Sequence, residues 1–371
     1  MKITRIEPIP VCVPLKNGLT TKTAHGEHVV SSYVLVRVHT DEELVGLGEA
    51  TVAPRWTGET SQSCVAAIEE LIGPALTGKD PSRITTLRAV MDRELKLNPF
   101  TKAAVEMALW DLAGKAAGKP VYDLLGGKVR DAVPIKMVVG GFEVERARAL
   151  AEQFLTWGVR CLKVKVGLDP DADVERVAAV RKLAGMKIPL GVDANCGWDL
   201  TTARRTLRRL AEHDLLFAEQ PIPPGDPVAL AALPREQGTP VMADESVFTL
   251  ADAWQLAVHQ AAEIFSVYPG KHGGISGTVE IVHVARAAGL ACALGSNLEL
   301  GVGTAAMLHV AACLPNIASE SYPADAIGPL YHEADLLTEP LELGPVAAKV
   351  PAGPGLGVEL DEEQVRRWRQ Q

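Results

Sequence analysis

The chain has 371 residues, and with 47% hydrophobic and 22% charged residues its composition is that of a globular protein larger than one ordinary domain. The formal net charge of −9 argues against nucleic acid and anionic membranes as partners, although it is compatible with a local cationic site for an acid. The sequence contains no run of about 18 apolar residues, so no transmembrane helix is expected.

Cysteine usage points to a reducing compartment. The six cysteines are scattered along the chain, without the CxxC spacing of a metal or redox site. The residues after Met1 are too polar for the apolar part of a signal peptide. We therefore expect a cytoplasmic protein.

The expected elements of residues 1–127 form an α+β unit. Three strands are expected, the last two joined as a hairpin: Ile3–Val13, Ser32–His39 and Leu44–Glu49. Apolar residues then recur at helical spacing in three segments: Ser61–Leu76, Ser82–Leu95 and Thr101–Ala117. The polar stretch Lys16–Val29 shows no periodicity and is expected to be a mobile loop.

Residues 128–325 alternate between apolar runs and helical segments. Eight strands are expected, at Pro134–Val139, Cys161–Val166, Ile188–Asp193, Leu215–Glu219, Pro240–Asp244, Ile264–Tyr268, Ala291–Ser296 and Ile317–Glu320. Helices between them include Asp173–Leu183, Thr201–His213 and Gly277–Ala288. This pattern predicts an α/β fold, a (β/α)8 barrel with a short or missing last helix and an N-terminal α+β capping domain. The Pro/Gly-rich residues 326–371 are expected to return to the capping domain.

Three carboxylates stand at the ends of consecutive predicted strands. Glu219 lies 26 residues after Asp193, and Asp244 lies 25 residues after Glu219. About 25 residues is the length of one strand, one helix and two short loops, so the three side chains should meet on the barrel face that carries catalysis. Converging carboxylates repel one another unless a hard cation lies between them, and the spacing therefore predicts a Mg²⁺ or Mn²⁺ site.

A pair of lysines lies one predicted strand earlier. Lys163 and Lys165 alternate along the strand and so point to the same side, into a barrel interior that apolar residues normally fill. Beside a dication and a partner lysine their pKa values should fall, which suits a general base toward a carbon acid. The alternative is that one lysine reaches solvent and the other pairs with a carboxylate. Each carboxylate taken singly could also be a strand-end cap, but the joint pattern favours the metal site.

Because of these motifs, the chain resembles the enolase superfamily. Within it, the chain resembles the muconate lactonizing enzyme (muconate cycloisomerase) / mandelate racemase-like family. Further matching segments are Ala108–Leu112, Leu124–Gly127, Lys271–Ile275 and Pro354–Gly357. The resemblance implies that the substrate is a small carboxylic acid whose carboxylate binds the metal. A barrel lysine then removes or delivers the α-proton, and the metal stabilises the enolate. It also implies that loops near Asn17–Val29 and Thr51–Gly58 set specificity and that the protein is a homo-oligomer.

One position departs from the family pattern. Relatives usually carry a second catalytic lysine at the end of strand six, three residues before the lysine of the Lys-x-Gly-Gly segment. Here that position is Tyr268, and Lys271 matches the later lysine. Either residue is a candidate replacement, but tyrosine is a poor carbon-acid base because its reference pKa is about 10. The site thus favours proton transfer on one face, as in cycloisomerisation or elimination, over two-base racemisation.

Several weaker candidates for substrate contact complete the site. They are Asn195, Glu245, Ser296, Asn297, Glu299, Glu320 and His25. Asn195 is expected to orient Lys165 and Glu245 to position Lys271, while Glu299 and Glu320 lie near the ends of strands seven and eight. A hydroxy-acid dehydratase or a racemase of the same superfamily is the alternative activity, and a metal-binding protein without activity is the alternative from another class.

Overall fold

The computed structural model describes residues 1–233 and 238–370. The N-terminal unit is an antiparallel sheet in the order β1 (Ile3–Pro14), β4 (Val30–Thr40), β5 (Val45–Ala50), covered on one side by the long helix α5 (Pro99–Ala117). The helix lies so close to β5 that a Cβ atom at Gly48 would be 1.8 Å from the Ala104 carbonyl oxygen. Glycine is therefore required there for the contact between helix and sheet.

The expected helix Ser61–Leu76 is interrupted by a π-helical turn. The chain forms α2 (Ser61–Ala67), the π turn Ile68–Ile72 and α3 (Gly73–Leu76), in which the Gly73 N–H donates to the Ile68 carbonyl. The other helices of this unit are α1 (Pro54–Thr57), α4 (Ile84–Glu94) and α6 (Val121–Leu124). Pro74 explains the local change, because it lacks the N–H that a regular α-helix would use.

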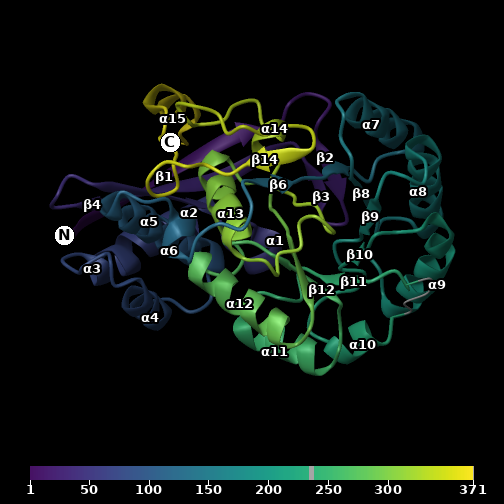
Figure 1. Ribbon diagram of the computed structural model, residues 1–371, viewed down its shortest axis with the longest axis horizontal. Helices are drawn as coiled ribbons and strands as arrows, with labels where there is room; N and C mark the ends of the chain where they lie inside the picture. Colours follow the sequence, from purple (N-terminus) through teal and green to yellow (C-terminus); the bar gives the residue numbers. More distant parts are fainter. Residues whose placement is uncertain (234–237, 371) are drawn as a thin grey trace.

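The stretch Lys16–Val29, expected to be a loop without structure, contains a small hairpin. Strand β2 (Thr21–Thr23) pairs with β3 (Gly26–His28), and the Gly141 N–H of the barrel donates to the Lys22 carbonyl at 2.7 Å. Strands of three residues are too short to show alternation in the sequence. In Figure 1, the hairpin lies beside the barrel strands β8 and β9.

Within residues 1–233 and 238–370, seven parallel strands form the barrel sheet, in the order β7 to β13. They are β7 (Met137–Val139), β8 (Leu162–Lys165), β9 (Leu190–Asp193), β10 (Ala218–Glu219), β11 (Val241–Ala243), β12 (Ile264–Val267) and β13 (Ala291–Leu294). Consecutive strands are neighbours throughout, which is the arrangement that the alternating pattern predicted.

The eighth barrel position is irregular. The expected strand Ile317–Glu320 is not a continuous strand in the structure. Isolated bridges join Ile317 to Cys292 and Ala324 to Ile135, so this segment closes the barrel between β13 and β7. Between the bridges the chain makes a turn, in which the Tyr322 N–H donates to the Ala318 carbonyl. The segment resumes at Ala324, and its end is Asp325 rather than Glu320.

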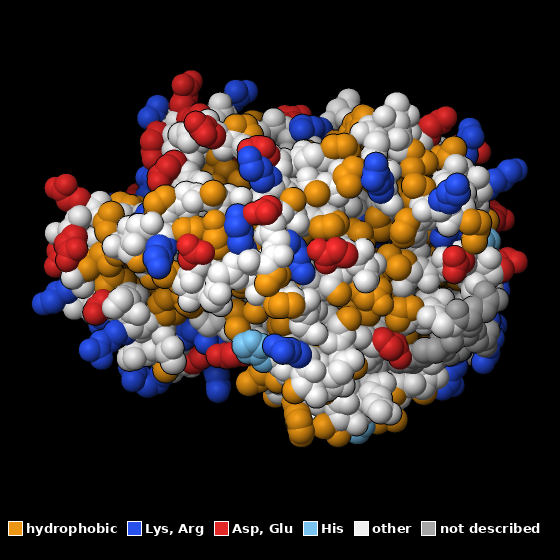
Figure 2. Space-filling view, in the orientation of Figure 1, with side chains coloured by type: hydrophobic (Ala, Val, Ile, Leu, Met, Phe, Trp, Pro, Cys, Tyr) orange, Lys and Arg blue, Asp and Glu red, His pale blue; other side chains and the backbone are white. Residues whose placement is uncertain are grey.

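Helices cover the outside of the barrel, as the ring of teal and green helices in Figure 1 shows. They are α7 (Val144–Thr156), α8 (Pro170–Ala184), α9 (Leu200–Leu210), α10 (Pro227–Ala231), α11 (Leu250–Val258), α12 (Ile275–Ala287) and α13 (Gly301–Cys313). On the face in Figure 2, acidic and basic side chains are interspersed among apolar ones. Within the described ranges, no helix is both long and apolar enough to cross a membrane.

The last helix of the barrel is reduced, as expected, to the four residues of α14 (Gly328–Tyr331). Further along, β14 (Ala347–Lys349) pairs with β6 (Ala132–Pro134), and α15 (Glu362–Trp368) packs near β1, where Arg369 bridges to Val11. The division of the chain at residues 127 and 325 stays a prediction.

Two buried carboxylates of the N-terminal unit cap barrel helices. Glu106 on α5 accepts hydrogen bonds from the Ile275 and Ser276 N–H groups at the start of α12, at 2.7 and 2.9 Å. Glu49 on β5 accepts from Leu300 and Gly303 at the start of α13, at 2.7 and 2.8 Å. A carboxylate at a helix N-terminus satisfies free N–H groups and complements the helix dipole. These contacts fix the N-terminal unit on the barrel.

We expect Glu106→Ala to lower the free energy of unfolding by about 3 kcal/mol, because it leaves buried donors at the start of α12 without an acceptor. Urea denaturation followed by circular dichroism measures the loss. The exposed Glu94 is the matched control on a neighbouring helix, and Glu94→Ala should change stability by about 0.5 kcal/mol or less. Equal losses in the two variants would contradict the capping role.

Candidate active site

The three predicted carboxylates meet at the carboxyl ends of adjacent strands. Asp193 ends β9 and pairs in register with Glu219, which ends β10, while Asp244 follows β11 directly. All three side chains are buried. The parallel register brings them together because strands that neighbour one another in the chain also neighbour one another in the sheet.

The two lysines of β8 point toward these carboxylates. Lys165 Nζ donates to Asp193 Oδ2 at 2.6 Å and to Asn195 Oδ1 at 2.7 Å. Lys163 Nζ donates to Glu219 Oε2 at 2.9 Å. Both lysines therefore face the barrel interior, and Asn195 contacts Lys165 as expected. Neither lysine reaches solvent freely, since the Lys165 side chain is only 13% exposed.

A fourth carboxylate, Asp325, belongs to the cluster and was missed in the sequence. It accepts a hydrogen bond from Lys163 at 2.7 Å and lies 3.2 Å from Lys136 Nζ. The signal for Lys136 was present, because it alternates with Val138 on the first predicted barrel strand and so points inward. Asp325 was hidden by the turn that interrupts the eighth segment.

Asp325 changes the balance of charge around Lys163. Burial opposes its charge, but Asp325, Glu219 and Asp193 outweigh burial and raise the Lys163 pKa well above its usual value. The sequence expectation that a dication lowers the lysine pKa values did not count Asp325, and it stays a prediction. These three carboxylates favour the charged form of Lys163 at the base of the site.

These side chains line a cavity of about 530 Å³ below the capping unit. Its wall includes nine of the predicted site residues, namely Lys163, Lys165, Asp193, Asn195, Glu219, Asp244, Ser296, Asn297 and His25. The hairpin β2–β3 and the segment Thr51–Trp56 provide much of the opposite wall, which is where the family resemblance placed the specificity loops. The cavity size suits a small organic acid.

The two candidates on strand six lie behind this wall. Lys271 is fully buried, and its Nζ donates to the Asp244 carboxylate, to the Asp244 carbonyl at 2.9 Å and to the Ser266 carbonyl at 2.8 Å. Two of its donors therefore hold Asp244, and the third is bound by Ser266 on β12. The sequence analysis expected Glu245 to position Lys271. Instead, the Glu245 carboxylate contacts Asn195 and His25.

Tyr268 is also fully buried, and its hydroxyl has no hydrogen-bond partner among the described residues. Burial, followed by the charges of Asp244 and Glu299, raises the Tyr268 pKa well above its usual value. A phenol in this state is less ionised at neutral pH than an ordinary tyrosine, so it supplies even less phenolate to act as a base.

Two further acids do not reach the cavity wall. Glu299 is buried, accepts hydrogen bonds from the Ser296 hydroxyl and the Asn297 N–H, and so shapes the loop after β13. The expected substrate contact of Glu320 is corrected by the structure. Glu320 lies on the turn of the eighth segment, is 64% exposed and pairs with Arg130 at 3.2 Å. Asp325 takes the place at the site that the sequence analysis gave to Glu320.

The acidic side chains form a donor set that fits a hard divalent cation. Burial and the charge of Asp193 raise the pKa of Glu219 to about 7, and burial raises the pKa of Asp244. By contrast, Lys165 and Lys163 overcome burial and lower the pKa of Asp193 to about 2. Buried oxygen ligands that repel one another in this way are stabilised by a cation such as Mg²⁺ or Mn²⁺.

Two family models match the chain. The mandelate racemase / muconate lactonizing enzyme N-terminal domain matches residues 5–126, and the enolase C-terminal domain-like model matches residues 145–364. The chain belongs to the mandelate racemase/muconate lactonizing enzyme family. This result confirms the resemblance, and with it the barrel fold and an isomerase or lyase of the enolase superfamily.

Members of this family with different reactions are about equally similar to the chain. The chloromuconate cycloisomerase of Cupriavidus necator is 35% identical over 369 residues, which are 98% of this chain and 97% of the relative. The L-Ala-D/L-Glu epimerase of Bacillus subtilis is 35% identical over 361 residues, which are 96% and 97% of the two chains. The structure of muconate lactonizing enzyme from Pseudomonas fluorescens complexed with muconolactone has a TM-score of 0.95 at 32% identity and covers 100% of this chain and 99% of its own. Overall similarity therefore leaves the reaction to be argued from the site.

Proposed function

We propose that this protein transfers a proton to or from the carbon next to a carboxylate, on one face of a small carboxylic acid, with Mg²⁺ or Mn²⁺ as cofactor. A cycloisomerase-type reaction fits this chemistry best. The observation that carries the proposal is the asymmetry of the lysines. Two lysines on β8 face the cavity, whereas the strand-six position carries a buried tyrosine and the nearby Lys271 is engaged with Asp244.

Lys165 is proposed as the proton donor or acceptor. Its ammonium group lines the cavity and is oriented by Asn195 and Asp193, so its proton points along fixed directions. Lys163 lies deeper, among Glu219 and Asp325, and stays charged. A fixed positive charge there lowers the energy of negative charge that develops on the substrate as the proton moves.

Asp193, Glu219 and Asp244 would hold the metal ion. When bound, the ion supplies charge stabilisation for the substrate carboxylate and a fixed point for its orientation. Lys271 contributes by holding the carboxylate and carbonyl of Asp244 with two hydrogen bonds, while a third bond to the Ser266 carbonyl anchors Lys271 itself.

A two-base racemisation is not supported by this arrangement. It needs a second proton-transfer group on the far face of the α-carbon, and among the described residues the strand-six end presents no lysine to the cavity. Elimination of a β-hydroxyl group would use the same single face, so a dehydratase stays the alternative. A homo-oligomeric state and a cytoplasmic location also stay predictions.

Proton exchange tests the proposal. The protein with Mg²⁺ is incubated in deuterated buffer with a library of mono- and dicarboxylic acids, including unsaturated acids and lactones. We expect deuterium at the α-carbon of one substrate class, with retention of configuration, measured by NMR and mass spectrometry. Loss of water from the substrate would favour the dehydratase, and inversion of configuration at a comparable rate would contradict one-face transfer. No exchange with any acid would favour the metal-binding protein without activity.

Tyr268→Phe separates a structural from a catalytic tyrosine. Because the hydroxyl is buried without a partner among the described residues, its removal should leave the exchange rate within about twofold and raise the unfolding free energy by about 1 kcal/mol. Exchange kinetics and urea denaturation measure the two effects. A rate loss of 100-fold with unchanged stability would instead assign the proton transfer to Tyr268.

A further inference from the structure

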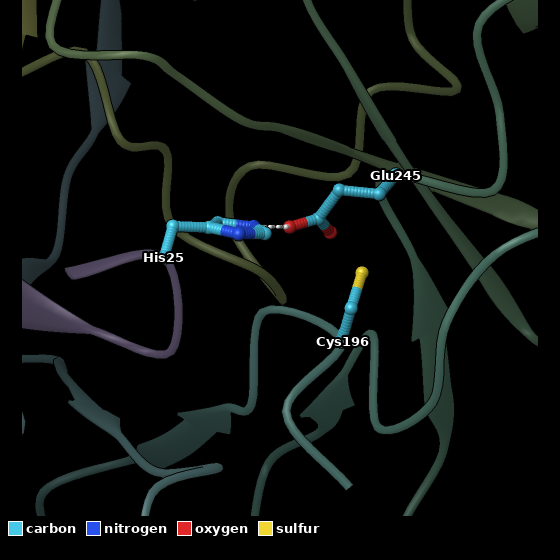
Figure 3. Close-up of side chains that lie close together, drawn as sticks. All are labelled: His25, Cys196 and Glu245. Carbon is cyan, nitrogen blue, oxygen red and sulfur yellow. Dashed lines mark hydrogen bonds and ion pairs between the residues drawn. The ribbon is translucent and has the colours of Figure 1, made fainter. Parts of the chain in front are cut away.

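Three potential ligands of a softer cation converge beside the proposed catalytic site, as Figure 3 shows. His25 lies in the turn of the β2–β3 hairpin, Cys196 in the loop after β9, and Glu245 in the loop after β11. One ligand atom from each residue lies within 4.8 Å of the other two. An imidazole, a thiol and a carboxylate from three separate segments thus point to one place.

The contacts of this cluster leave coordinating atoms available. His25 Nε2 is 3.0 Å from Glu245 Oε1, which also accepts from Asn195 Nδ2 at 3.0 Å. The second oxygen, Glu245 Oε2, is buried and has no hydrogen-bond partner among the described residues. A buried carboxylate oxygen without a donor is costly, and a cation would compensate it.

The loop geometry gives Cys196 its position. Asn195 and Cys196 have φ angles of 41° and 65°, a left-handed conformation that is uncommon for residues other than glycine. The Cys196 N–H is fixed by the Gln220 carbonyl at 2.9 Å. The thiol is therefore held toward Glu245 by the same turn that carries Asn195 to Lys165.

The chemistry of the donors differs from that of the Asp193, Glu219 and Asp244 site. Three carboxylates select hard cations such as Mg²⁺, whereas sulfur, imidazole nitrogen and one carboxylate select Zn²⁺ and similar transition metals. In a tetrahedral Zn²⁺ site the ligand atoms lie about 3.3 to 3.7 Å apart. The His25 and Glu245 atoms, 3.0 Å apart, are already this close, so any contraction concerns the distances to the Cys196 sulfur, which are at most 4.8 Å.

We propose that His25, Cys196 and Glu245 form a second metal site, selective for Zn²⁺-like ions, that fastens the β2–β3 hairpin to the barrel. Binding replaces the proton of the Cys196 thiol, which passes to solvent, and leaves the fourth position of the metal for water. Because the hairpin forms part of the cavity wall, the bound ion would hold that part of the wall in the position it has in this structure. The site uses none of the three proposed Mg²⁺ ligands, and neither proposal depends on the other.

Cobalt provides the direct test, because Co²⁺ replaces Zn²⁺ and gives a thiolate charge-transfer band in the near ultraviolet. The full-length protein is first saturated with Mg²⁺ and then titrated with Co²⁺. We expect the band to appear with one equivalent, to disappear when Zn²⁺ is added, and to be absent in Cys196→Ser. His25→Ala should weaken Co²⁺ binding at least about tenfold.

Two controls match these variants. Cys12→Ser removes another partly exposed cysteine, from β1, and should keep the band. Asp193→Asn alters the oxygen site and should also keep it, so failure of the proposed magnesium function leaves this test intact. Circular dichroism verifies that each variant is folded. No band in the wild-type protein, or a band that persists in Cys196→Ser, would overturn the proposal.

Hydrogen exchange tests the fastening of the hairpin. With free Zn²⁺ at about 100 times its dissociation constant, opening of residues 21–28 that breaks the site should become about 100-fold rarer. Mass spectrometry should show this protection in the wild-type protein and in Cys12→Ser, but not in Cys196→Ser. Zn²⁺ binding without protection of the hairpin would refute the fastening role.

Discussion

Lys165→Ala is expected to reduce α-proton exchange by about 10³-fold, because it removes the side chain proposed to carry the proton. The affinity for Mn²⁺ should not fall, since Lys165 is not a proposed ligand and its charge competes with the metal ion for Asp193. Exchange in deuterated buffer gives the first quantity, and electron paramagnetic resonance of Mn²⁺ gives the second. The two measurements separate loss of proton transfer from loss of the metal.

Two further variants serve as comparisons for Lys165→Ala: Asn195→Ala and Lys119→Ala. Asn195→Ala removes one of the two groups that orient the Lys165 ammonium, and we expect an intermediate loss of about tenfold in the exchange rate. Lys119 is an exposed lysine, and its replacement should leave the rate unchanged. Rapid exchange on both enantiomers of one substrate that survives Lys165→Ala would contradict the proposed role of Lys165.

Asp193→Asn is expected to weaken Mn²⁺ binding by about 100-fold or more and to abolish measurable exchange. The change removes one charge from the proposed ligand set and leaves Lys163 and Lys165 with one carboxylate fewer to balance them. Titration calorimetry with Mn²⁺ measures the affinity. The pair Asp193→Asn and Lys165→Ala should therefore differ in metal binding while sharing the loss of activity.

Glu320→Gln is the control for this experiment, because the sequence placed Glu320 near the site whereas the structure places it on the surface beside Arg130. Metal affinity and exchange should both match the wild-type protein. If Asp193→Asn bound Mn²⁺ as tightly as Glu320→Gln does, the proposed metal site would be wrong.

The site residues that follow regular strands could be predicted from the sequence, because their positions depend on local spacing. Asp193, Glu219 and Asp244 recur at the length of one βα unit, and each such unit adds one neighbouring strand. Lys163 and Lys165 follow from simple alternation within one strand. These inferences need no knowledge of contacts between distant segments.

The remaining contacts depend on packing between distant segments and left no local signal. Asp325 reaches Lys163 only because a turn interrupts the eighth segment, which moves the end of that segment five residues past Glu320. His25 and Glu245 are 220 residues apart and meet through a hairpin with strands of three residues. The direction of the Lys271 side chain likewise depends on acceptors at the end of β11 and on β12, namely the carbonyls of Asp244 and Ser266.

The helix-capping carboxylates Glu49 and Glu106 have a consequence for how new specificities arise. Since they bind the N-terminal unit to the starts of α13 and α12, exchanging that unit between relatives would leave helix ends without acceptors unless both acids were kept. Chimaeras that swap only the hairpin and the Thr51–Trp56 segment avoid this cost. Substrate range in this protein should therefore be easier to redesign by loop grafting than by domain shuffling.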